Sequence, residues 1–302
     1  MLSRRDFLKT SGVVALGAAA TACSSGGSNG EPSGSKTFDE IIAGRTQTLQ
    51  YIGVGTELLS RQPERLTFGI AQSTGLVVGA EGELWIAADR NAAAQGPFPI
   101  VERGDGLPPD RSFYAAEVTF PTDGTFQVLV DVKVDGEERF AAGMVQIGRT
   151  MQMPMPGDQA IVTPTPTPEA TMGVDPICTR RPPCGMHEVS LDDALERGDK
   201  VFLSIATPAF CTSKLCGPEI DMIEETRKGF EDLTFIHIEV LANDDTETVQ
   251  RFGPLSPAAL AWKLEQEPAI YAIGSDGKID ERWLGPVDRT EITGIAERLS
   301  QA

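Results

Sequence analysis

Cysteine is the residue whose number and spacing point most directly to chemistry in this chain. There are five cysteines among 302 residues: Cys23, Cys178, Cys184, Cys211 and Cys216. Thiols act as nucleophiles, form disulfides or bind soft metal ions, according to their surroundings. Four of the five lie between residues 178 and 216, so we expect the chemistry in the second half of the chain.

Four cysteines allow three disulfide pairings. We predict the pairing that is local in sequence, Cys178–Cys184 and Cys211–Cys216. The first bridge would pin the start of the second domain. An alternative is a second redox pair that relays electrons to Cys211 and Cys216.

The first 23 residues have the form of an export signal. Residues 3–9 contain the adjacent Arg4 and Arg5, and a short apolar run, Gly12–Ala20, follows. A basic start, a short apolar core and a small-residue end are typical of a cleaved signal. The core is shorter than the roughly 20 apolar residues of a transmembrane helix. The paired arginines indicate twin-arginine export in a bacterium-like cell, whose cargo can fold before it crosses the membrane.

The end of this signal resembles a lipobox, in which a cysteine is lipidated and becomes the mature N-terminus. Here that cysteine is Cys23, and residues 24–36 form a Ser/Gly-rich tether. We predict a protein anchored by lipid on the extracytoplasmic face of the cell membrane, with plain cleavage and secretion as the alternative. Export would leave the four remaining cysteines in an oxidising compartment, where disulfides form.

Composition indicates a globular protein of about two domains. The chain is 40% hydrophobic, and its net charge of -18 comes from 26 basic and 44 acidic residues. This charge argues against nucleic-acid partners, which clustered Lys and Arg side chains bind. We divide the chain into a signal (1–23), a tether (24–36), a β domain (37–149), a Pro/Thr-rich linker (150–174) and an α/β domain (175–302).

The β domain shows strong alternation of apolar and other residues, as in Phe126–Val134. Two Asp-Gly pairs, Asp123-Gly124 and Asp135-Gly136, indicate hairpin turns. We expect an antiparallel sandwich of immunoglobulin-like form. Because residues 37–149 contain no Cys or His, a binding or spacer module is the predicted role. The alternating prolines of the linker that follows favour an extended spacer between the two domains.

The second domain alternates predicted strands with predicted helices, which indicates a mixed sheet covered by helices. Strands are expected at Val201–Ala206, 234–241, 268–273 and 278–284. Helices are expected after Ser190, after Pro218, at 257–264 and around residues 292–299.

The residues from Ala206 to Pro218, with Cys211 and Cys216 at the strand-to-helix turn, and Pro268 before a later strand resemble the thioredoxin-like superfamily. The resemblance covers nearly the whole second domain. It implies that the thiol pair is the active site and that Pro268 is the cis-proline that lies against it. The family's usual C-x-x-C motif is replaced here by C-x4-C.

The long spacing leaves the roles of the two thiols open. The N-terminus of a helix stabilises a thiolate, which favours Cys216 as the nucleophile. Counted forward from the preceding strand, Cys211 occupies the family's nucleophile position. Steric access also favours Cys211 as the nucleophile. A bridge requires Cys211 to lie outside the helix, because regular helix would separate the two positions by about 7.5 Å.

We therefore expect thiol–disulfide exchange, with exported proteins that carry thiols or disulfides as partners and no cofactor. One alternative is a non-catalytic binding or recruitment lipoprotein with structural disulfides. Another is a thioredoxin-like copper chaperone, although we assign no metal site. His187 and His237 are the only histidines, and His237, inside a predicted strand, is expected to be structural.

Overall fold

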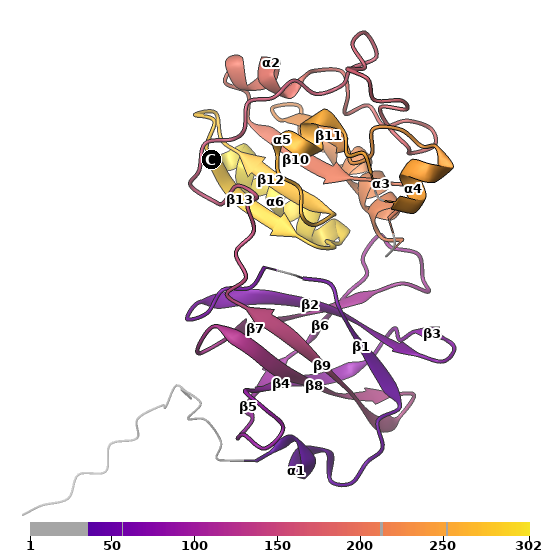
Figure 1. Ribbon diagram of the computed structural model, residues 1–302, viewed down its shortest axis with the longest axis vertical. Coiled ribbons are helices and arrows are strands. Elements are labelled where there is room, and N and C mark those ends of the chain that lie inside the picture. Colours follow the sequence, from indigo (N-terminus) through magenta and orange to yellow (C-terminus); the bar gives the residue numbers. More distant parts are fainter. Residues whose placement is uncertain (1–35, 56, 212–213, 252) are drawn as a thin grey trace, which may run out of the picture. The chain divides into compact units, whose positions relative to one another are not determined.

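The computed structural model describes residues 36–55, 57–211, 214–251 and 253–302 (Figure 1). Arg4, Arg5 and Cys23 lie outside the described residues, as does the predicted signal. Among the helices of the described part, none has the length and apolar content to cross a membrane.

The first domain consists mainly of strands that belong to one hydrogen-bonded sheet. The strand order is β5-β4-β8-β9-β1-β2-β7-β6, and β3 pairs with β2. Within the described residues of this domain, the paired strands are antiparallel except β1 and β9, which run parallel. The elements are α1 (Phe38–Ile42), β1 (Leu49–Gly53), β2 (Pro63–Gln72), β3 (Gly75–Leu76), β4 (Glu81–Ala87), β5 (Gln95–Pro99), β6 (Val101–Arg103), β7 (Phe113–Thr119), β8 (Gly124–Val134) and β9 (Glu137–Ile147).

Period-two alternation explains how these strands build a core. On β8, Val128, Val130 and Val132 are buried in one apolar cluster. Successive side chains of a strand point to opposite faces, so one face of each strand can be apolar. The prediction of a sheet-rich, largely antiparallel domain is confirmed, while its likeness to an immunoglobulin domain stays a prediction.

The two Asp-Gly pairs behave differently. Asp135 and Gly136 have φ values of 52° and 84° and join β8 to β9 as an antiparallel hairpin. Positive φ at both central residues is what a type I′ turn requires. Asp123-Gly124 makes no hairpin, because β7 pairs with β2 and β6, whereas β8 pairs with β4 and β9.

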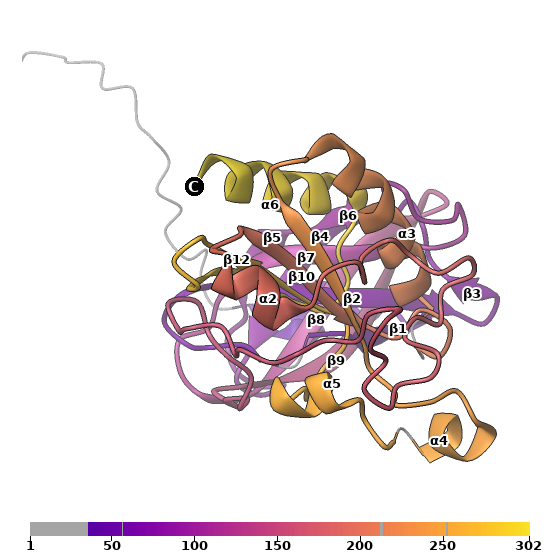
Figure 2. The ribbon, with the colours of Figure 1, turned by 90° about the horizontal axis from the view of Figure 1, so that it is seen from above.

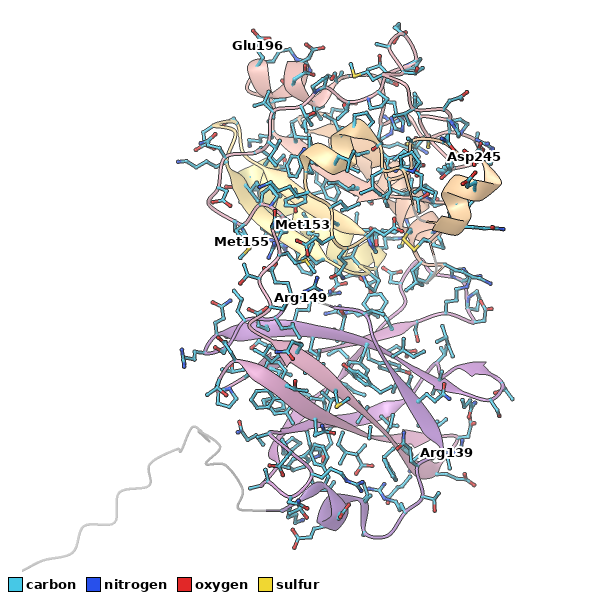
Figure 3. The ribbon with its side chains drawn as sticks, in the orientation of Figure 1. Arg139, Arg149, Met153, Met155, Glu196 and Asp245 are labelled. Carbon is cyan, nitrogen blue, oxygen red and sulfur yellow. A yellow bond between two sulfur atoms is a disulfide. The ribbon has the colours of Figure 1, made fainter. Side chains whose placement is uncertain are left out.

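The Pro-rich segment packs onto the second domain instead of standing free. Met151, Met153 and Ala160 are buried in one apolar cluster of that domain. Backbone bonds add to this packing, since the N–H groups of Gly157 and Ala160 donate to carbonyls of the second domain. Figure 3 labels Met153 and Met155 along this stretch. The segment therefore contributes apolar side chains to the core that supports the candidate site.

The second domain is a four-stranded mixed sheet of order β11-β10-β12-β13. Strands β10 and β11 are parallel, and β12 is antiparallel to both β10 and β13. The mixed sheet that the sequence predicted is thus confirmed. The elements are α2 (Leu191–Glu196), β10 (Val201–Ala206), α3 (Cys216–Thr226), the 3-10 turn Arg227–Gly229, β11 (Thr234–Glu239), α4 (Thr246–Arg251), α5 (Pro257–Ala261), β12 (Ala269–Ile273), β13 (Ile279–Leu284) and α6 (Arg289–Gln301).

Helices cover both faces of this sheet (Figures 1 and 2). Side chains of α3 and α6 pack with Phe202, Phe235 and Ile270 on one face. Side chains of α2 and α5 pack with Leu203 and Ile236 on the other. All four cysteines of the domain belong to the cluster on the α3/α6 face, so both thiol pairs lie on the same side of the sheet.

Candidate functional site

Cys211 and Cys216 are joined by a disulfide bond, with their Cα atoms 6.0 Å apart. This separation lies within the range of about 4.4–6.8 Å that a bridge requires. Cys216 is the first residue of α3, whereas Cys211 lies in the loop between β10 and α3. A turn brings Cys211 into reach, since its N–H donates to the carbonyl of Thr207 and its carbonyl accepts from Lys214.

The two sulfurs of this bridge have different surroundings. Cys216 is fully buried at the N-terminus of α3, while Cys211 is 8% exposed. The first N–H groups of a helix and its dipole favour negative charge. One turn further along α3, burial raises the pKa of the Glu219 carboxyl to about 8. The helix N-terminus therefore stabilises a thiolate at Cys216. Access from solvent instead favours Cys211 as the sulfur that a partner protein can reach.

Pro268 lies at the same end of the sheet as the disulfide loop. Ile205 near the end of β10 pairs with Ala269 at the start of β12, so Pro268 comes directly before this register position. The Glu267–Pro268 peptide bond is cis. The Glu267 carboxylate accepts a 3.0 Å hydrogen bond from the N–H of Thr207, and burial raises its pKa to about 7.

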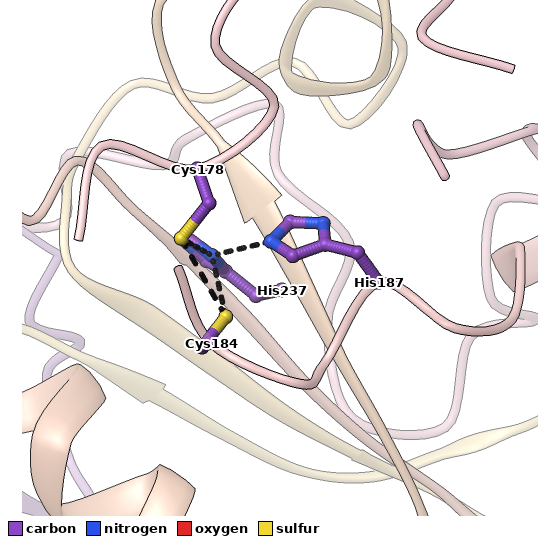
Figure 4. A group of neighbouring side chains, drawn as sticks. All are labelled: Cys178, Cys184, His187 and His237. Atoms are coloured by element: carbon purple, nitrogen blue, oxygen red, sulfur yellow. Dashed lines mark hydrogen bonds between the residues drawn. The ribbon is translucent and has the colours of Figure 1, made fainter. Parts of the chain in front are cut away.

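A second group of reactive side chains lies on the same face of the sheet. Cys178, Cys184, His187 and His237 are all buried, and one ligand atom from each lies within 4.8 Å of the other three (Figure 4). The sulfurs of Cys178 and Cys184 are 3.6 Å apart and unbonded, so the disulfide that the sequence predicted between them is not present in the structure. Two imidazoles occupy the space around these sulfurs.

The distances within this Cys–His cluster, as we name the four residues, are short. The Nδ1 atom of His237 lies 3.8 Å from the Cys178 sulfur and 3.5 Å from the Cys184 sulfur. The Nε2 atom of His187 lies 3.1 Å from the same Nδ1 atom. In Figure 4 the four side chains converge on one point from three segments of chain.

Strand alternation and one backbone hydrogen bond position these side chains. On β11, alternation directs Phe235, His237 and Glu239 to the face that α3 and α6 cover, and Ile236 and Ile238 to the other. The loop that carries Cys184 and His187 runs along the edge of β11, because the N–H of His237 donates to the carbonyl of Met186. A loop and an edge strand thereby form one site.

Hydrogen bonds orient the cluster further. The His237 Nε2 atom lies 2.9 Å from the carbonyl oxygen of Ala206. A carbonyl only accepts, so Nε2 donates and the neutral ring presents an unprotonated Nδ1 to the sulfurs. Beside Cys178, the N–H and the Oγ1 of Thr179 each donate a 2.8 Å bond to the buried Glu239 carboxylate.

Mutual contact shifts the pKa values of the cluster. The contact with Cys184 lowers the pKa of the Cys178 thiol, and so do its contacts with the two histidines, against the effect of burial. The contact with Cys178, together with burial, raises the pKa of Cys184. Burial opposes protonation of His237, but Cys178 and the charge of Glu239 raise its pKa above the usual value. The arrangement thus favours one thiolate in the pair.

Sequence reasoning missed this cluster. It assigned no metal and treated His237 as a structural residue of a strand. Two signals were available: the C-x2-H spacing of Cys184 and His187, and the alternation that directs His237 to the face carrying the cysteines. Thiolate and imidazole donors are the ligands of structural zinc sites.

Comparison with known proteins gives one family match. Residues 1–21 match the TAT (twin-arginine translocation) pathway signal sequence. No curated protein matches the chain.

Several solved structures, among them the three that follow, are similar to parts of the chain. A thiol:disulfide interchange protein, a thioredoxin family protein from Chlorobium tepidum TLS, is 14% identical over 49% of this chain and 98% of its own, with a TM-score of 0.33. The endo-beta-1,4-mannanase from Thermotoga petrophila is 8% identical over 37% of this chain and 22% of its own, with a TM-score of 0.20. The ZirS C-terminal domain is 10% identical over 42% of this chain and 88% of its own, with a TM-score of 0.19. Identities and TM-scores this low carry no information about activity.

The export signal is therefore established by its own match, and the fold of the second domain by its own topology. The chain carries a twin-arginine signal for export across the cytoplasmic membrane, and its C-terminal α/β domain combines a mixed sheet, a disulfide at the start of a helix and a cis-proline before a strand.

Proposed function

We propose that this protein catalyses thiol–disulfide exchange on other exported proteins through Cys211 and Cys216. The observation that carries the proposal is the disulfide between a loop residue after β10 and the first residue of α3. A thiolate at a helix N-terminus has a lowered pKa and serves as a nucleophile or a leaving group.

The exchange conserves electrons between two sulfur pairs. In the reduced protein, a thiolate attacks one sulfur of a partner disulfide, and the other partner sulfur leaves as a thiolate that takes up a proton. The second cysteine then attacks the mixed disulfide, which releases the reduced partner and restores the Cys211–Cys216 bond. The reverse sequence oxidises a partner dithiol.

We assign the partner-facing role to Cys211 and the resolving role to Cys216. Cys211 is 8% exposed and lies in a loop, whereas Cys216 is fully buried beneath it. Attack within the mixed disulfide requires no access from solvent, so the buried Cys216 suits the second step.

The remaining parts of the chain would hold the C-terminal domain at the membrane and bind or space it from its partners. We propose that Cys23 is lipidated and anchors the protein to the extracytoplasmic face of the membrane, and that the immunoglobulin-like β domain acts as a binding or spacer module. Radioactive palmitate labelling of the exported protein tests the anchor, with Cys23→Ala as its control; equal labelling of both proteins would exclude it.

Trapping of the mixed disulfide tests the proposed exchange. Cys216→Ser leaves Cys211 to form a mixed disulfide that cannot be resolved, so exported proteins should accumulate as adducts visible on non-reducing gels. Cys211→Ser is the matched control and should accumulate far fewer adducts. Equal adduct levels would refute the assigned roles, and the absence of adducts from both would refute the exchange.

A purely structural bridge is the second candidate, and the burial of both cysteines favours it. Structural disulfides have reduction potentials below about -300 mV. Under this alternative the domain would serve only to recruit partners, and both variants would lose stability without gaining adducts.

A further inference from the structure

We propose that Cys178, Cys184, His187 and His237 form a four-coordinate site for one Zn²⁺ ion. The site is separate from the Cys211–Cys216 disulfide, and it stands independently of the exchange function. Its ligand atoms are the two sulfurs, His187 Nε2 and His237 Nδ1.

Four of the six distances between these atoms match the edges of a zinc tetrahedron. Zn–S bonds of about 2.3 Å and Zn–N bonds of about 2.0–2.1 Å imply edges of about 3.8 Å between sulfurs, 3.6 Å between sulfur and nitrogen, and 3.3 Å between nitrogens. The corresponding separations here are 3.6 Å between the sulfurs, 3.5 and 3.8 Å from the sulfurs to His237 Nδ1, and 3.1 Å between the imidazoles. The two remaining separations, from His187 to the sulfurs, are within 4.8 Å.

Charge and burial favour a divalent ion at this point. All four side chains are buried, with exposed fractions of 1%, 7%, 4% and 0% in chain order. Burying an uncompensated charge is strongly unfavourable. One Zn²⁺ ion displaces the protons of the two thiols to solvent, and the resulting set of two thiolates, two neutral imidazoles and one dication has no net charge.

Groups outside the ligand set orient the ligands. The bond from His237 Nε2 to the carbonyl of Ala206 selects the tautomer whose Nδ1 can bind a metal. Glu239 holds the residue after Cys178 through both hydrogen bonds from Thr179. Such partners fix ligand orientation and are a regular feature of metal sites in proteins.

The two thiols can instead form a disulfide, and the geometry disfavours that state. A bonded pair would have its sulfurs about 2.05 Å apart. It would also leave the two imidazole nitrogens facing each other with no ion between them. Because cargo of the twin-arginine pathway can fold before it crosses, zinc can occupy the site before the thiols enter an oxidising compartment.

The metal content of the full-length exported protein tests the site. Purified without chelators, it should contain one zinc per chain, and X-ray absorption should give two sulfur and two nitrogen neighbours at the distances above. Replacement by Co²⁺ should produce the visible bands of a tetrahedral ion and a thiolate charge-transfer band. These measurements on the unaltered chain do not depend on whether a variant folds.

Variants locate the ion. Cys184→Ser and His187→Asn should each lower zinc affinity by more than about 100-fold. This is a larger loss than removal of a residue that only hydrogen-bonds a ligand would cause. Cys211→Ser with Cys216→Ser is the matched control and should keep one zinc per chain. The proposal is overturned if the unaltered protein binds no stoichiometric zinc, if mass spectrometry finds a Cys178–Cys184 disulfide in it, if it takes up copper to the exclusion of zinc, or if Cys184→Ser retains the metal.

Discussion

The Oγ1 atom of Thr179 accepts a 3.2 Å hydrogen bond from the backbone N–H of Ala209. Thr179 directly follows Cys178, and Ala209 lies two residues before Cys211. The same hydroxyl donates to the buried Glu239 carboxylate, so it lies between the Cys–His cluster and the disulfide loop. The two thiol pairs are therefore joined by a single polar side chain.

Replacement of Thr179 by Val should destabilise the domain and loosen the disulfide loop. It preserves shape but removes the donor to Glu239 and the acceptor for Ala209, and a buried polar group left unpaired costs about 1–3 kcal/mol. We expect the free energy of unfolding in urea to fall by about 2 kcal/mol or more. Thr179→Ser keeps the hydroxyl, so an equally large loss there would contradict this explanation.

Protonation of Glu219 should make stability depend on pH. Its pKa is raised to about 8 in the folded protein by burial, so between its unfolded value near 4.5 and 8 the folded state binds more protons than the unfolded state. Stability therefore falls as pH rises through this window, by up to about 1.4 kcal/mol per pH unit.

The Glu219→Gln variant isolates this contribution, because its side chain carries no charge at any pH. The difference in unfolding free energy between Glu219→Gln and the unaltered protein should grow from pH 5 to pH 8 in favour of the variant. Glu267→Gln is the comparison variant, whose effect should level off near pH 7, where the pKa of Glu267 lies. A difference that stays constant with pH would show that Glu219 is ionised throughout.

Loss of the Cys211–Cys216 bridge should cost little stability. The bridge closes a loop of six residues, and the chain-entropy estimate for such a short loop is about 2 kcal/mol. We expect the double variant Cys211→Ala, Cys216→Ala to remain folded, with an unfolding free energy lower by about that amount. Complete unfolding of this variant at 25 °C would indicate that the bridge is primarily structural.

Removal of Met153 should test whether the Pro-rich segment belongs to the second domain. Met153 is 2% exposed in the apolar cluster of that domain, so truncation to Ala should cost about 2–5 kcal/mol. Met155, two residues on, is only half-buried, and its truncation should cost much less. If truncation of Met153 has as small an effect on thermal unfolding as truncation of Met155, the segment does not contribute to the core.

The sequence was sufficient to predict the second domain because its signals are local. The apolar run Val201–Ala206 matches β10 residue for residue, and the strand expected at 278–284 and the helix expected after Pro218 occur as β13 and α3. Helix α4 was not predicted, since the short segment Thr246–Arg251 has no apolar periodicity.

Non-local pairing explains most of what the sequence did not reveal. The parallel pairing of β1 with β9 joins strands from opposite ends of the first domain. The Cys–His cluster likewise combines loop residues 178–187 with His237 of β11, and no periodicity links them. The buried Met151 and Met153 were overlooked because alternating prolines indicated an extended spacer.

The reduction potential of the Cys211–Cys216 bond tests the proposed exchange function most directly. The exported protein would be equilibrated with redox buffers, alkylated at each potential, and analysed by mass spectrometry to locate the bridge. Reversible exchange predicts that the Cys211–Cys216 couple has a reduction potential above about -300 mV. The alkylation state of Cys178 and Cys184 should not change over the same range of potentials. A bridge that resists reduction to below that value, in a protein that neither reduces nor oxidises insulin, would contradict the account.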